Sequence, residues 1–119
     1  MAKASQVVLL ENEFYLIKAP NGKVLEIKNF NTENGAAIRL WDSAGHPWQQ
    51  WQFVDAGEGR WRIRNRFTGK FIDLALGGVV EGTWLHQWGR TSGLSQCWAL
   101  ESTRNGRTRI RNVLADKYI

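Results

Sequence analysis

Apolar and polar residues alternate over short stretches along most of this chain, and Gly-rich turns separate the stretches. A period of two places successive side chains on opposite faces of a β-strand. Short strands at close spacing are typical of an all-β sandwich or barrel. The pattern predicts almost no helix, and it predicts strands over residues 5–10, 14–18, 24–27, 37–41, 49–54, 61–65, 71–74, 84–88 and 108–112.

The stretch from Trp61 to Leu100 is a complete copy of a unit that the rest of the chain repeats. Downstream, TRIRN at 108–112 restates WRIRN at 61–65. A fixed period of this size indicates a repeat architecture, and four strands per unit predict a closed, pseudo-three-fold β fold. The upstream landmarks Ile17, Gly22-Lys23, Glu26, Trp41, Gln49 and Trp51 match Ile63, Gly69-Lys70, Asp73, Trp88, Gln96 and Trp98, at offsets of 46 (63 − 17) and 47 (98 − 51).

The third copy of the repeat is incomplete. We expect one domain over residues 1–119, with repeat 1 at about 14–54, repeat 2 at about 60–101 and a partial repeat 3 at about 106–119. Residues 5–11 resemble residues 95–101 and are expected to close the third repeat, which then lacks an aromatic strand and its loops. The alternative is that the chain is a piece of a longer protein. Either way, unpaired strand edges predict self-association, or completion by a missing segment or a partner.

Aromatic content is high, and it favours a packed core without cross-links. The 119 residues include seven Trp and five Phe, and each large aromatic side chain buries about 150–250 Å². The single cysteine, Cys97, excludes an intramolecular disulfide, and two His with one Cys far apart make no metal-ligand spacing. We therefore expect no metal and no cofactor. The N-terminal ten residues read as neither a signal peptide nor a membrane span, so a cytoplasmic, reducing setting is the default expectation.

Positive charge gathers on two related strands. The chain carries a formal net charge of +5, which favours acidic partners. Our interpretation is a solvated outer face, and the alternative is a site for an acidic polymer. The arginines recur with a period of two, at Arg62, Arg64 and Arg66 and again at Arg107, Arg109 and Arg111.

The recurring Gln-x-Trp motif, QQW at 49–51 and QCW at 96–98, stands in register with the other landmarks. In this the chain resembles the ricin-B-type (R-type) lectin β-trefoil family over about residues 14–119. The resemblance implies an all-β β-trefoil, with Trp51 and Trp98 packed in the core near the pseudo-three-fold axis. It also implies shallow sugar pockets, one per repeat. Each pocket uses an acid, an aromatic, a polar residue two positions before that aromatic, and a polar-Gln pair before the core Trp.

The second repeat keeps most of the family's pocket. Asp73 stands at the acid position, His86 and Trp88 at the polar and aromatic positions, and Ser95-Gln96 at the polar pair. A carboxylate accepts hydrogen bonds from sugar hydroxyls, and an indole face covers the apolar face of a sugar ring. In the alternative, these residues have structural roles. Asp73 caps a turn, Gln96 forms hydrogen bonds with the backbone, and Trp88 is a half-buried packing residue.

The first repeat departs further from the family pattern. Glu26 replaces Asp, Arg39 takes the polar position and Trp48 the Asn position, while Trp41 and Gln49 match. A longer carboxylate beside a cation either pairs internally and closes the site or favours an acidic sugar.

The resemblance implies a carbohydrate-binding lectin module for galactose- or N-acetylgalactosamine-type glycans. Two alternatives stay open: a trefoil interaction domain of a toxin, inhibitor or scaffold that binds no sugar, and a binder of acidic polymers. An enzyme is not expected, because the chain has no G-x-S-x-G, no phosphate-binding Gly-rich loop and no acid/base dyad. The expected partners are glycans, and neither nucleic acid nor membrane insertion is expected.

Overall fold

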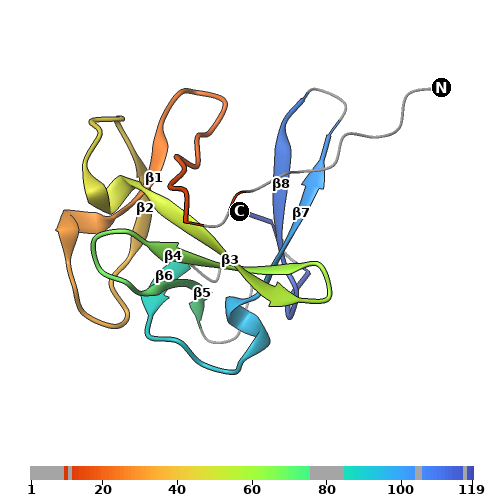
Figure 1. Ribbon diagram of the computed structural model, residues 1–119. Coiled ribbons are helices and arrows are strands. Elements are labelled where there is room, and N and C mark those ends of the chain that lie inside the picture. The colour runs from red at the N-terminus through yellow and green to blue at the C-terminus, as the bar shows by residue number, and fades with distance from the viewer. Residues whose placement is uncertain (1–9, 11, 76–84, 104–105, 117) are drawn as a thin grey trace.

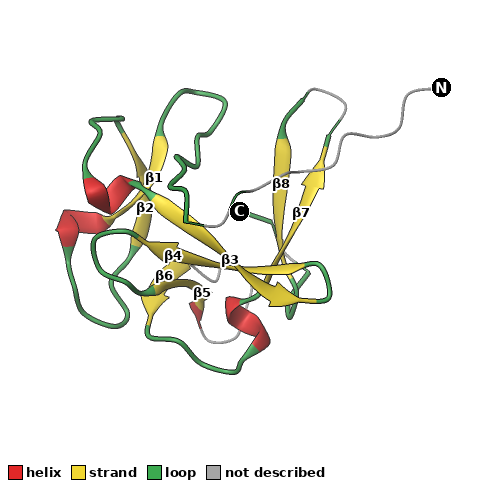
Figure 2. Ribbon diagram, viewed as in Figure 1, coloured by secondary structure: helices red, strands yellow, loops and turns green. Residues whose placement is uncertain are grey.

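The computed structural model describes residues 10, 12–75, 85–103, 106–116 and 118–119. The described residues form strands joined by short 3₁₀ turns, in an all-β arrangement (Figure 1, Figure 2). The prediction of an all-β chain is thereby confirmed. The elements are β1 (Val24–Ile27), η1 (Lys28–Phe30), β2 (Ile38–Trp41), η2 (Pro47–Gln49), β3 (Trp51–Gly57), β4 (Arg60–Asn65), β5 (Phe71–Leu74), β6 (Leu85–Trp88), η4 (Leu94–Gln96), β7 (Trp98–Ser102) and β8 (Thr108–Asn112).

The strand pairs repeat with the sequence period. β1 pairs with β2, and a larger sheet runs β6-β5-β4-β7-β8 with β3 also paired to β4. In the β1–β2 pair Glu26 lies opposite Arg39, and in the β5–β6 pair Asp73 lies opposite His86. Both positions shift by 47 residues (73 − 26, 86 − 39), so the two strand pairs have the same register. We call the parts built from the three repeats sectors: β1–β3 belong to the first, β4–β7 to the second and β8 to the third.

The core is built around the two tryptophans of the Gln-x-Trp motifs. Trp51 and Trp98 are fully buried, as predicted. Each indole Nε1 donates to a backbone carbonyl, that of Leu25 in β1 or of Ile72 in β5, at 3.1 Å. The indole therefore packs in the core and satisfies its only polar group there. The surrounding buried apolar residues include Leu25, Ile27, Ala36, Phe53, Ile63, Ile72 and Ile110.

Two buried asparagines shape the turns that follow β4 and β8. The side-chain oxygen of Asn65 accepts the backbone N–H groups of the second and third residues after it, at 2.9 and 3.1 Å, and that of Asn112 does the same at 3.1 Å each. Their amide groups donate to the carbonyls of Trp48 and Ser95, at 3.1 and 2.9 Å. Trp48 and Ser95 are themselves 47 residues apart (95 − 48), so the same turn is built twice.

Two predicted strands differ from the structure. Residues 14–18 form no continuous ladder: they pair only through isolated bridges, from Tyr15 to Trp51 and from Lys18 to Val24. A ladder needs successive paired residues, and this segment meets neighbouring chain at two separate points. The strand predicted over 49–54 begins at Trp51, because Gln49 belongs to η2. Of the strand predicted over 5–10 only Leu10 is described, so closure of the third repeat by residues 5–11 lies outside the described residues.

The predicted solvated arginine face is wrong at Arg62. Arg64 and Arg66 of the first arginine set are exposed, whereas Arg62 is buried and its Nη1 donates to Oε1 of Gln96 at 3.2 Å. Arg62 thus links β4 to η4 and does not face solvent. Cys97 is a buried free thiol, as expected of a structural cysteine.

Candidate functional site

The β5–β6 register brings the acid and polar residues of the second repeat together. Asp73 and His86 are cross-strand partners, and His86 Nε2 lies 2.8 Å from Asp73 Oδ2. Both side chains are only 13% exposed, so the pair is largely buried. Trp88 lies two residues after His86 and on the same strand face.

One oxygen of the Asp73 carboxylate has no donor. Asp73 Oδ1 is buried and makes no hydrogen bond among the described residues. A buried acceptor without a donor destabilises a fold by about 1–3 kcal/mol, and more if it is charged. Such a group is suited to receive a hydrogen bond from something that the protein itself does not provide.

Trp88 is partly exposed to solvent. Its residue is 38% exposed, and its ring lies 5.4 Å from that of His86 at 32°. The ring lies beside Gly35 of the first sector, where an added Cβ would be 3.7 Å from Cζ3. Asn34 Oδ1 accepts the N–H of Gly89 at 3.0 Å beside it. A loop of the first sector therefore supports the aromatic platform of the second.

Gln87 holds the same loop through hydrogen bonds to its backbone. It is fully buried, as its place between outward-facing residues predicts, and its Nε2 donates to the carbonyls of Asn31 and Glu33, each at 2.8 Å. These two bonds satisfy its amide N–H groups, whereas its buried Oε1 makes no hydrogen bond among the described residues. Trp84, which the alternation places on the same face as Trp88, lies outside the described residues.

The Gln side chains of the two motifs form hydrogen bonds with the backbone in both sectors. Gln96 is fully buried, donates to the Gly89 carbonyl at 2.8 Å and accepts the Thr91 N–H at 3.0 Å. Gln49 is fully buried too and makes the equivalent pair of bonds at 2.8 Å, with the backbone of residues 42 and 44. Each Gln closes the loop after its aromatic strand, so it positions the aromatic and is not open to a ligand. Ser95 is half-buried, and its carbonyl accepts from Asn112.

In the first sector an arginine fills the equivalent site. Glu26 is buried, and its carboxylate accepts Nε of Arg39 at 2.8 Å and Nε2 of Gln49 at 2.9 Å. The guanidinium of Arg39 also lies 3.8 Å above the centroid of the Trp41 ring. Arg39 therefore pairs with the acid and lies over one face of the Trp41 ring, while Trp41 as a whole remains 48% exposed.

Trp48, at the family's Asn position, belongs to an aromatic cluster beside this closed site. Its ring lies 5.1 Å from Phe30, 5.6 Å from Phe67 and 4.3 Å from His46, which stacks on it at 15°. The sequence offered no partner for His46, because the stacking depends on how its loop folds back. A cavity of about 240 Å³ lies at this site, and its lining includes Phe30, His46 and Trp48 of the cluster together with Glu26, Arg39, Trp41 and Gln49.

Residues 6–88, more than half of the chain, match the model of the family described as ricin-type beta-trefoil lectin domain-like. The chain belongs to this family. The recurring Gln-x-Trp motif and the shared register of the two sectors fit that membership. No curated protein matches this lectin-type chain by sequence.

Solved structures confirm the β-trefoil fold. A designed three-fold symmetric protein, ThreeFoil, superposes with a TM-score of 0.85 at 27% identity, over 88% of this chain and 76% of that one. An exo-beta-1,3-galactanase from Clostridium thermocellum gives a TM-score of 0.85 at 27% identity, over 92% of this chain. The lectin of Polyporus squamosus, solved with the epitope Neu5Aca2-6Galb1-4GlcNAc bound, gives 0.77 at 20% identity over 94% of this chain.

The trefoil corresponds to only part of the larger relatives. It spans 24% of the galactanase chain and 40% of the Polyporus squamosus lectin chain. The family's fold is a carbohydrate-binding one, and this chain shares it. Among the described residues no cluster of His, Cys, Asp or Glu could hold a metal ion, and no helix is long and apolar enough to cross a membrane.

Proposed function

We propose that the second sector binds one sugar ring of a glycan, with Trp88 as the stacking platform. The observation that carries this proposal is the partly exposed indole of Trp88 beside a carboxylate, Asp73, that lacks one hydrogen-bond donor. A sugar presents an apolar C–H face to an aromatic ring and a hydroxyl donor to a carboxylate. His86 holds the carboxylate in place through its 2.8 Å contact and borders the same ring.

The proposal assigns one working site to the described part of the chain. In the first sector Arg39 occupies the position of a ligand, since it satisfies Glu26 and covers Trp41 at once. A sugar would have to displace a charged hydrogen bond to a buried carboxylate, and such bonds are worth about 1.5–3 kcal/mol. The first-repeat candidates, Glu26, Arg39, Trp41, Trp48 and Gln49, then stabilise the fold rather than bind a glycan.

Galactose and N-acetylgalactosamine are the proposed sugars. The family resemblance implies this class, and what two structural relatives act on or were solved with supports it. One is an exo-beta-1,3-galactanase, and the other was solved with an epitope that contains galactose. Affinity at one shallow site is expected to be weak, so useful binding would need several linked sites.

Titration calorimetry with galactose and N-acetylgalactosamine tests the proposal. Trp88→Ala should abolish binding and leave the melting temperature almost unchanged, because the ring is partly in solvent already. Trp41→Ala is the matched control in the first sector and should bind as the parent does. Asp73→Asn should weaken binding by about 1.5–3 kcal/mol, the scale of a hydrogen bond to a charged group.

Two results would contradict the assignment. If Trp88→Ala binds like the parent, the sugar site is elsewhere. If Trp88→Ala unfolds, the ring is structural and the interaction-domain alternative takes precedence.

A further inference from the structure

One edge of β6 is covered by residues 31–37 of the first sector, which we call the 31–37 loop. The backbone N–H of Gln87 donates to the carbonyl of Ala36 at 3.0 Å, and the Gln87 carbonyl accepts the N–H of Gly35 at 2.8 Å. In an extended strand, alternate residues bond to opposite neighbours. Both backbone groups of Gln87 bond to this loop, so β5, which also pairs with β6, lies on the opposite edge of β6.

The proposed sugar site therefore has a second border, on the side away from Asp73. Asp73 belongs to β5, Trp88 belongs to β6, and the 31–37 loop follows beyond β6. Hydrogen-bonded neighbours in a sheet lie about 4.8 Å apart, so the backbone of Asp73 and the loop are separated by about 10 Å across the sheet. A pyranose ring is about as wide as one strand spacing. A ring that bonds to Asp73 thus leaves the loop to the next ring of a glycan.

Trp88 extends toward this second border. A Cβ added to Gly35 would lie 3.7 Å from Cζ3, an atom of the six-membered ring of the indole. Gly35 has a φ of +85°, a conformation that residues with a side chain rarely adopt. The indole therefore lies close to bare loop backbone, and both Gly35 and Trp88 are exposed. No side chain at position 35 blocks a ligand that continues past the indole.

Asn34 places an amide group at this end of the indole. Its Oδ1 accepts the N–H of Gly89 at 3.0 Å, which fixes the amide next to Trp88. A backbone N–H can only donate, so the amide oxygen faces Gly89 and Nδ2 turns away from it. Asn34 is exposed, and its Nδ2 makes no hydrogen bond to the described part of the chain. Nδ2 can therefore donate to a ligand while Oδ1 keeps its place in the fold.

We propose that Asn34 is a specificity-determining residue of the sugar site and that it contacts the second ring of a glycan. The terminal ring stacks on Trp88 and donates a hydroxyl to Oδ1 of Asp73. The next ring lies beside Gly35, where Nδ2 of Asn34 donates to an oxygen that only accepts, a ring or acetamido carbonyl oxygen. The site then prefers a disaccharide unit to a single sugar. This inference rests on the proposed function, because it needs a sugar on Trp88.

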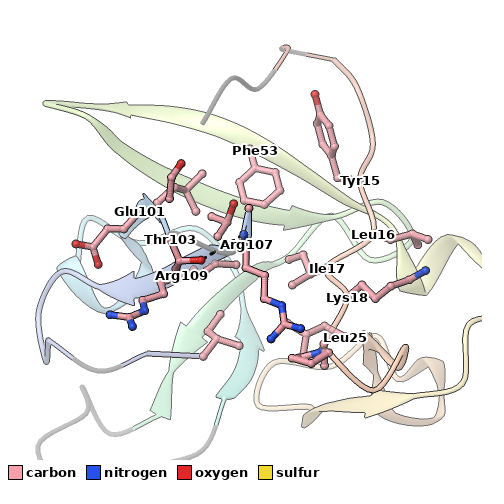
Figure 3. A pocket seen from close by; sticks show the side chains of 18 of the residues that line it. Tyr15, Leu16, Ile17, Lys18, Leu25, Phe53, Glu101, Thr103, Arg107 and Arg109 are labelled. Atoms are coloured by element: carbon pink, nitrogen blue, oxygen red, sulfur yellow. Dashed lines mark hydrogen bonds between the residues drawn. The ribbon is translucent and has the colours of Figure 1, made fainter. Parts of the chain in front are cut away.

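A separate hollow of the molecule is also large enough for a disaccharide. A groove of about 1160 Å³ lies between residues 15–20 and the β7–β8 hairpin (Figure 3). Neither Trp88 nor Asn34 lines it. Arg107 does line it and is exposed, so Arg107→Ala reports whether a sugar binds there instead.

Titration calorimetry on the full chain compares galactose with disaccharides in which galactose is linked β1,3 or β1,4 to a second hexose or N-acetylhexosamine. The parent should bind at least one disaccharide about two- to tenfold more tightly than galactose, the scale of one added hydrogen bond. Asn34→Asp should lower the affinity for that disaccharide to the affinity for galactose, and leave galactose binding unchanged. Aspartate keeps an oxygen for the N–H of Gly89 and removes the Nδ2 donor, so the platform stays in place.

Asn21 provides the matched control. It is an exposed asparagine in the turn before β1, and its Oδ1 accepts a backbone N–H, that of Lys23, at 3.0 Å. Asn21→Asp makes the same chemical change with the same added charge, away from the site. It should bind galactose and the disaccharide as the parent does, and so should Arg107→Ala. Trp88→Ala should bind neither sugar.

The outcomes separate this inference from the function on which it rests. A parent that binds no sugar, or a Trp88→Ala variant that binds like the parent, overturns the sugar site and the role of Asn34 together. If those two chains behave as expected, three results overturn the role of Asn34 alone. The first is a disaccharide preference that is absent from the parent or unchanged in Asn34→Asp. The second is an equal loss for galactose and disaccharide in Asn34→Asp, since Asn34 would then only position Trp88. The third is a preference lost in Arg107→Ala, which would place the second ring in the groove.

Discussion

The Glu26–Arg39 pair gives the sharpest energetic prediction of the structure. Replacing Arg39 with Met removes the guanidinium and keeps an unbranched apolar stem of similar reach. The Glu26 carboxylate, whose side chain is only 4% exposed in the parent, then loses its 2.8 Å donor. We expect the variant to be less stable than the parent, because a buried charge is left without its main partner.

The magnitude follows from what remains around Glu26. Removing one partner of a buried ion pair typically destabilises a protein by about 3–5 kcal/mol. Gln49 Nε2 still donates to Glu26 at 2.9 Å, and the Arg39 side chain is 28% exposed, so water can enter where it stood. These two factors reduce the expected loss to about 2–3 kcal/mol. With an unfolding entropy of about 2.1 cal/mol/K per residue, the melting temperature should fall by about 8–12 °C.

Urea and thermal unfolding of four chains measure the effect: the parent, Arg39→Met, Glu26→Gln and the double variant. The double variant should be more stable than Arg39→Met, because it removes the uncompensated charge as well. If Arg39→Met unfolds within 0.5 kcal/mol of the parent, about the range of an ordinary surface substitution, the pair is not a buried anchor. The first sector would then be free to exchange Arg39 for a ligand.

Two further predictions concern the core. Trp98→Ala should destabilise by about 3–5 kcal/mol, seen as a melting temperature about 12–20 °C lower, and a melt that overlays the parent would refute the core role of this indole. Asn112→Ala leaves the backbone groups of its turn without partners and should lose about 1–3 kcal/mol in urea unfolding. Asn65→Ala should lose a similar amount, because its turn has the same bonds, and a large difference between the two would contradict the pseudo-symmetry.

Much of the fold could be predicted because the repeat constrains it. The Gln-x-Trp period placed Trp51 and Trp98 at equivalent positions, and both are buried. The alternation gave the bounds of β1 and β5 as the structure has them. Both signals are local or periodic, so they can be read without knowing which segments meet in space.

Contacts of individual side chains and loops could not be predicted, since no periodic signal marks them. The Asn34 loop beneath Trp88 belongs to the other sector, 55 residues away from its partner Gly89. Arg62 reaches Gln96 across 34 residues, although its alternation reads as a solvated face. The sequence left open whether Arg39 pairs with Glu26 or favours an acidic sugar, and it gave no sign that the guanidinium lies over Trp41. Each case depends on where a long side chain or a loop ends up after the sectors have packed.

The first and second sectors differ in their acid and polar residues. Exchanging these residues tests why only one sector is proposed to bind sugar. Asp73 and His86 occupy the register positions of Glu26 and Arg39, and Trp88 follows as Trp41 does. In the double variant Asp73→Glu, His86→Arg, the longer carboxylate reaches the new guanidinium, which can lie over Trp88 as Arg39 lies over Trp41. The fold should keep its melting temperature while calorimetry shows sugar binding lost.

The reverse exchange is the control for that result. Glu26→Asp with Arg39→His shortens the first-sector pair and uncovers Trp41, so the face now covered at 3.8 Å becomes available to a sugar. Weak binding should appear at a second site, because the change supplies the acid and the open ring that the second sector already has. If Asp73→Glu, His86→Arg still binds sugar like the parent, an arginine at this position does not close the platform. In that case the position of Arg39 over Trp41 would not explain why only one site binds sugar. This conclusion would hold whatever the stability of either variant.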